Sequence, residues 1–189
     1  GSPIIYHTKS LVKKLQKSLG EKYFVEYAMR YKNPSIKSVL AKLKSQNLNQ
    51  IIIIPLFPQY ASATNGSVIE EVMNIVKKWW VIPEINFVSQ FYDEKLFLDA
   101  FAENGKKYNI KDYDEIIFSF HGLPERHVDK VYETSLCKDN DCEKGINELN
   151  KFCYKATCYE TAKQIANRLK LKKSDYIVAF QSRLDNKWL

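Results

Sequence analysis

The side chain best placed for chemistry in this sequence is His121. It directly follows the apolar run at residues 115–120 and precedes Gly122, which permits unusual backbone angles, and Pro124 stiffens the exit. An imidazole held at the end of a strand is mostly neutral at pH 7 and can accept a proton or bind a metal ion. The alternative is a structural, hydrogen-bonded histidine. His121 is therefore the candidate catalytic residue.

The second chemical feature is a cluster of cysteines with the spacing C-x4-C-x10-C-x4-C. In a reducing compartment such a cluster binds a metal more often than it forms disulfides. Structural zinc sites favour tighter pairs, whereas iron–sulfur clusters tolerate more irregular loops. An iron–sulfur cluster, zinc and four free thiols all remain open on spacing alone. The four candidate ligands are Cys137, Cys142, Cys153 and Cys158.

The last two cysteines lie near a predicted helix start. Thr157, with Glu160 three residues later, fits a capping box. This places Cys158 in the first turn, where the helix dipole favours a thiolate. Cys153 and Cys158 can both be ligands only if the chain between them is non-helical, which the capping box makes plausible.

The surrounding sequence alternates predicted helices with predicted strands. Asn33 and Pro34 fit a cap and first helical position, and residues 51–54 form a β-branched run that suits a strand covered on both faces. The spacing of apolar residues predicts helices around residues 11–19, 34–43, 68–80, 96–101 and 157–169, and strands at 23–29, 51–54, 85–88, 115–120 and 176–180.

This alternation predicts a doubly wound α/β fold with parallel sheets. The pattern restarts near residue 110, so we expect one lobe at residues 1–110 and a second at 111–189, with a four-cysteine insertion at about 137–158. Ligands of such folds bind at the carboxyl ends of strands. Residues 55–60, 121–124 and 181–183 leave strand ends and are expected to share one cleft.

Composition excludes several classes of protein. The 189 residues carry a formal net charge of +7. Many of the lysines suit solvated helix faces, and the rest of the positive charge would suit an anionic partner. The sequence has no glycine-rich phosphate loop, serine elbow or nucleic-acid module, so no nucleic-acid partner is expected. It has no spanning apolar run and no leader, which predicts a cytoplasmic location with peripheral membrane contact left open.

Residues 118–124, Phe-Ser-Phe-His-Gly-Leu-Pro, resemble the signature of the ferrochelatase family. Four further segments resemble family motifs in the same order. They are Gly-Ser-Pro-Ile at 1–4, Met-Arg-Tyr at 29–31 with Pro34, Pro-Leu-Phe-Pro-Gln-Tyr at 55–60, and Phe-Gln-Ser-Arg-Leu at 180–184 with Trp-Leu at 188–189.

The resemblance implies two Rossmann-like lobes around a porphyrin cleft and insertion of Fe²⁺ into protoporphyrin IX, a late step of haem synthesis. It makes His121 the active-site histidine, which accepts pyrrole protons or guides the metal. It assigns Arg30, Tyr60 and Trp188 to the cleft, where a guanidinium suits anionic propionates and aromatic rings suit a flat macrocycle.

The family also has a bacterial subgroup with four cysteines after the histidine, which bind a two-iron two-sulfur (2Fe-2S) cluster. The four cysteines here occupy the corresponding positions. The resemblance covers the middle of the family, and the family's acidic residue opposite the histidine is expected outside this chain. The alternatives are a non-catalytic porphyrin- or cluster-binding fragment, a zinc-stapled interaction protein, and a sister chelatase for cobalt or nickel.

Overall fold

The computed structural model describes residues 3–132 and 142–189 and divides into two compact units. The first comprises Gly1–Ile53 and Val68–Phe87, and the second comprises Ile54–Ser67 and Val88–Leu189. The chain therefore passes from the first unit to the second and back before it stays in the second. The lobe boundary near residue 110 stays a prediction.

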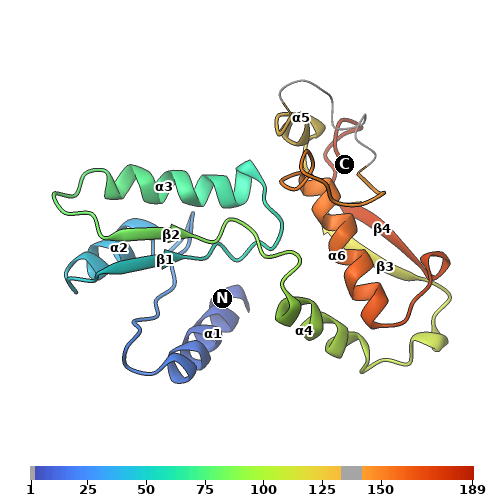
Figure 1. The fold of residues 1–189 in the computed structure, drawn as a ribbon, viewed down its shortest axis with the longest axis horizontal. Helices are drawn as coiled ribbons and strands as arrows, with labels where there is room; N and C mark the ends of the chain where they lie inside the picture. Colours follow the sequence, from blue (N-terminus) through green and yellow to red (C-terminus); the bar gives the residue numbers. More distant parts are fainter. Residues whose placement is uncertain (1–2, 133–141) are drawn as a thin grey trace. The chain divides into compact units, whose positions relative to one another are not determined.

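The first unit contains a two-stranded parallel sheet, β1 and β2 (Figure 1). Residues from α2, α3 and the sheet form one apolar core, which includes Leu40, Ile51 and Val72. Within the described part of this unit, α1 buries no residue. The elements are α1 (Pro3–Leu19), α2 (Ile36–Lys44), β1 (Gln50–Ile53), α3 (Ser67–Val76) and β2 (Glu84–Phe87).

The second unit contains the parallel pair β3 and β4, covered on one face by α6 (Figure 1). Small residues of α6, Ala162 and Ala166, pack against Phe118 of β3 and allow a close approach of helix and sheet. The elements are η1 (Ser62–Gly66), α4 (Lys95–Gly105), η2 (Ile110–Asp112), β3 (Ile116–His121), α5 (Glu125–Asp129), α6 (Tyr154–Arg168), η4 (Lys173–Asp175) and β4 (Tyr176–Gln181).

The structure confirms the predicted mixed α/β class with parallel sheets and corrects several local predictions. The strand predicted at residues 23–29 is wrong, because this segment is irregular and its one strand-like pairing is an isolated bridge between Met29 and Ser35. The helix start predicted at Asn33 is also wrong. Helix α2 begins at Ile36, since the Ser35 side chain accepts a hydrogen bond from the Ser38 amide and caps it.

Two apolar patterns also extend beyond what the fold buries. Helix α3 ends at Val76, and the side chain of Trp80 is fully exposed, so the predicted helix at 68–80 is too long. The run at residues 51–54 is covered on one face within the described structure. Ile51 is buried, whereas half of Ile52 is exposed.

Candidate functional site

His121 is the last residue of β3 and its side chain is exposed. Side chains alternate across a strand, so His121 shares a face with Ile117 and Ser119, while Phe118 and Phe120 face α6. The imidazole thus stands at the carboxyl end of a parallel strand and is accessible to a ligand, as the sequence predicts.

The peptide group that follows His121 is hydrogen-bonded at both edges. The Gly122 amide donates to the Gln181 carbonyl oxygen over 2.6 Å, and the Tyr154 hydroxyl donates to the His121 carbonyl oxygen over 2.9 Å. A Cβ atom on Gly122 would lie 2.9 Å from the Gln181 oxygen and 3.0 Å from that of Leu189. The expected reason for this glycine, an unusual backbone angle, is therefore wrong, since close backbone approach is what excludes a side chain.

Trp188 lies beside the chain that leaves His121. It forms an isolated antiparallel bridge with Pro124, and the Leu189 amide donates to the Leu123 carbonyl oxygen over 2.9 Å. Trp188 is half-buried. The structure therefore brings the segments that carry Trp188 and His121 together, and the cleft itself stays a prediction.

Tyr60 belongs to the loop after β1, which is part of the second unit. Its ring packs edge-on against Phe152 at a centroid distance of 6.2 Å. Asn65, which is fully buried, fastens the loop by donating from its amide to the carbonyl oxygens of Phe57 (2.9 Å) and Ser89 (2.7 Å). The loop is thus held by buried polar contacts.

One apolar cluster joins the chain next to each of these residues. It contains Ala61, which follows Tyr60, and Leu123, two residues after His121, with Leu189 packed against them. Cys142 and Cys153 belong to the same cluster. Three of the predicted site segments and the cysteine segment therefore share one core.

Arg30 belongs to the first unit. Its guanidinium lies 3.9 Å from the Glu71 carboxylate and 4.8 Å from the centre of the Tyr31 ring. The guanidinium is half-buried, and its role in binding an anion stays a prediction.

Three of the four cysteines are described, and all three are buried; Cys137 lies outside the described residues. The sulfur atoms of Cys142 and Cys153 are 3.8 Å apart. Two thiolates on one tetrahedral ion, each about 2.3 Å from it, would be about 3.8 Å apart. Within residues 3–132 and 142–189, however, no three metal-ligating side chains converge on one point.

The predicted helix start at Thr157 is wrong. Helix α6 begins at Tyr154 with Cys153 as its N-cap, and the Thr157 hydroxyl donates inside the helix to the Cys153 carbonyl oxygen over 3.0 Å. Cys158 therefore lies beyond the first turn, and burial raises the pKa of its thiol. Burial therefore disfavours the predicted thiolate. The chain between Cys153 and Cys158 is helical, so the expectation of a non-helical stretch there is also wrong.

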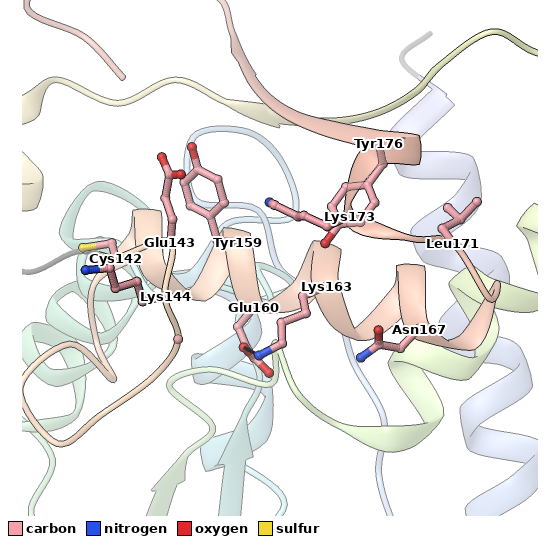
Figure 2. A pocket seen from close by; sticks show the side chains of 11 residues that line it. Cys142, Glu143, Lys144, Tyr159, Glu160, Lys163, Asn167, Leu171, Lys173 and Tyr176 are labelled. Atoms are coloured by element: carbon pink, nitrogen blue, oxygen red, sulfur yellow. Dashed lines mark ion pairs between the residues drawn. The ribbon is translucent and has the colours of Figure 1, made fainter.

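A cavity of about 330 Å³ lies on another part of the second unit (Figure 2). Its walls come from residues 142–145, from α6 and from the start of β4 at Tyr176, whereas His121 pairs with the last residue of β4. Lys163 and Glu160, which line it, form an ion pair at 3.5 Å. The cavity is thus separate from the exposed histidine.

Comparison with known proteins shows to which family the chain belongs. The sequence model of the ferrochelatase family matches residues 1–189. The chain belongs to the ferrochelatase family. Ferrochelatases of Legionella pneumophila (strain Paris), Pseudomonas fluorescens (strain SBW25) and Coxiella burnetii (strain Dugway 5J108-111) are 42%, 39% and 37% identical to it over 97%, 100% and 100% of this chain.

The chain spans about half the length of these curated ferrochelatases, namely 54%, 56% and 53%.

Within the described ranges no helix has the length and apolar character needed to cross a bilayer. Two features of the site were not predicted from the sequence: the hydrogen bond from the Tyr154 hydroxyl to the His121 carbonyl and the hydrogen bonds from the Asn65 amide to Phe57 and Ser89. Tyr154 stands next to Cys153, and that adjacency was the available signal.

Proposed function

We propose that this protein is a lyase that inserts Fe²⁺ into protoporphyrin IX to form protohaem, with His121 as the proton acceptor. The observation that carries the proposal is the exposed imidazole at the carboxyl end of β3 in a chain of the ferrochelatase family. Fe²⁺ is a substrate of this reaction. A cytoplasmic location and peripheral membrane contact stay predictions from the sequence.

The chemistry requires such a group. Free porphyrin carries two pyrrole N–H groups, so two protons leave as one Fe²⁺ enters and four N–Fe bonds form. A neutral imidazole accepts one pyrrole proton, becomes an imidazolium and releases the proton to solvent before it accepts the second, which suits the exposed His121. The peptide after His121 is bonded to Gln181 and Tyr154, which holds the backbone that carries the imidazole.

Arg30, Tyr60 and Trp188 are proposed to bind the porphyrin. The aromatic side chains offer apolar faces to the macrocycle, and the guanidinium offers a charge-assisted hydrogen bond to a propionate. Half-burial of Tyr60 and Trp188 leaves part of each ring available.

In a variant whose other tryptophans, Trp79 and Trp80, are replaced by Phe, porphyrin should quench the fluorescence of Trp188. Unchanged emission at saturating porphyrin would exclude Trp188 from the binding site.

The direct test uses the complete protein, protoporphyrin IX and ferrous iron under anaerobic conditions, with the visible bands as readout. We expect wild-type protein to convert the porphyrin spectrum to that of haem and His121→Ala to lose at least about 100-fold in kcat. The matched control is His7→Ala, because His7 is exposed on α1. Undiminished turnover by His121→Ala would remove the residue from the mechanism. Cobalt or nickel in place of iron tests the sister-chelatase alternative.

We also propose that Cys137, Cys142, Cys153 and Cys158 hold a 2Fe-2S cluster, with zinc as the alternative. The 3.8 Å separation of the Cys142 and Cys153 sulfurs supports two thiolates on one ion. When bound, the group would crosslink the cysteine segment to the start of α6. Iron with acid-labile sulfide and a brown absorption spectrum would identify the cluster, and colourless zinc-containing protein would identify the alternative.

A further inference from the structure

The peptide group between His121 and Gly122 is hydrogen-bonded to two other elements, β4 and α6. Its N–H donates to β4 at Gln181, and its carbonyl oxygen accepts from Tyr154, the first residue of α6. A peptide group is planar, so its N–H and C=O point to opposite sides. We propose that Tyr154 is a positioning residue that sets the direction of the His121 imidazole, an inference that rests on the proposed function.

The hydroxyl lies at the edge of β3 that faces away from β4. The Gly122 amide bonds to β4, so the His121 carbonyl of the same peptide points to the opposite side of β3. Within the described residues, no strand pairs with β3 on that side. The Tyr154 hydroxyl donates to the carbonyl there, where a neighbouring strand would otherwise do so.

The tyrosine itself is held firmly enough to act this way. Its ring packs against Phe180 at a centroid distance of 6.4 Å, and its hydroxyl is close to the Cys158 side chain. A donor fixed on a helix and on the sheet transmits the position of α6 to His121.

Loss of this bond should affect catalysis more than binding. Without the hydroxyl, the His121 carbonyl turns toward water, and the Cα–Cβ direction of His121 is less well defined. Misplacement of a reacting group slows the chemical step, whereas the porphyrin contacts of the other residues persist. The expected signature is therefore a lower kcat at nearly constant KM.

The test compares Tyr154→Phe with Tyr159→Phe. Tyr159 is the matched control because it lies on the same helix and its ring packs against the same Phe180, at a centroid distance of 6.2 Å. Its hydroxyl is hydrogen-bonded to Glu143 and not to His121. In the complete protein, Tyr154→Phe should lower kcat about tenfold with KM for porphyrin changed less than about twofold. It should also shift the carbonyl ¹³C resonance of His121 and speed hydrogen exchange of the Gly122 amide. Tyr159→Phe should change none of these.

Wild-type kcat in Tyr154→Phe overturns the proposal, and so does an unmoved His121 carbonyl resonance. If the wild-type protein inserts no metal, the proposed function is wrong but the role of Tyr154 is still testable. The His121 carbonyl resonance and the exchange rate of the Gly122 amide then decide whether Tyr154 positions His121. If Tyr154→Phe does not fold, the unmodified protein decides the matter by NMR. A protected Tyr154 hydroxyl proton coupled to the His121 carbonyl carbon supports the proposal, and absence of that coupling overturns it.

Discussion

The side-chain amide of Gln59 donates to the Thr161 hydroxyl over 2.9 Å and joins the loop after β1 to the middle of α6, 102 residues away in sequence. Both side chains are buried. The Thr161 hydroxyl in turn contacts the Thr157 carbonyl oxygen at 2.8 Å and the Tyr92 carbonyl oxygen at 3.3 Å. Gln59, the residue before Tyr60, is therefore anchored in the core by α6, and this anchor helps to place Tyr60.

Removal of the second anchor of this loop should destabilise the second unit. Asn65→Ala leaves the carbonyl oxygens of Phe57 and Ser89 without their side-chain donor, which should cost about 2–4 kcal/mol in the free energy of unfolding. Asn74→Ala is the control, because Asn74 is exposed and its side chain accepts a hydrogen bond from the exposed Lys77. It should change stability by less than about 0.5 kcal/mol in urea denaturation. Equal effects of both variants would contradict the anchoring role.

A methyl group at Gly122 should disturb the end of β3. In Gly122→Ala the added Cβ would meet the backbone oxygens of Gln181 and Leu189, neither of which can move cheaply, so we expect a loss of about 1–3 kcal/mol. Gly105→Ala is the control. Its Cβ would approach only the flexible end of Leu169, at 3.1 Å, and alanine favours the helix. Denaturation that ranks Gly105→Ala as the more damaging change would refute this account.

The elements whose residues bury an apolar stripe were predictable from the sequence. The helix around residues 96–101 and the strands at 115–120 and 176–180 are found as α4, β3 and β4, and the strands pack their periodic face against α6. The face predicted for α4 is wrong, because the helix buries Leu98 and Ala102 and leaves Leu96 and Phe101 exposed. The place of His121 at a strand end follows from this pattern alone. The family motifs added roles to these positions that periodicity does not contain.

The errors arose where a local preference competes with tertiary packing. Residues 23–29 have β-forming side chains, but within the described structure this segment finds no strand to pair with along its length. Thr157 fits a cap by sequence, yet its hydroxyl bonds inside a helix that begins at Tyr154. The Gln59 and Asn65 anchors were not predicted, because their partners are distant in sequence and only the fold brings them together.

The buried cysteines should be protected from alkylation in the metal-free protein. Cys153 and Cys158 are fully buried, and burial raises the pKa of the Cys158 thiol, so both the access and the reactive thiolate are reduced. At pH 8, iodoacetamide should modify Cys158 at least about tenfold more slowly in folded protein than in guanidinium-unfolded protein, as measured by mass spectrometry. Equal rates in the two states would show that the start of α6 is open in solution.

High pH should destabilise the protein through its buried tyrosines. Burial, aided by the Glu143 contact, raises the pKa of Tyr159 to about 12, while an unfolded phenol titrates near 10. Below pH 10 both states keep the proton and stability is unaffected. Between pH 10 and 12 the unfolded state loses its proton first, so the free energy of unfolding falls as pH rises. Tyr159→Phe removes one such group and should flatten this fall in urea denaturation from pH 8 to 11.5, relative to wild type. An unchanged slope would mean that the Tyr159 phenol is solvated in the folded protein.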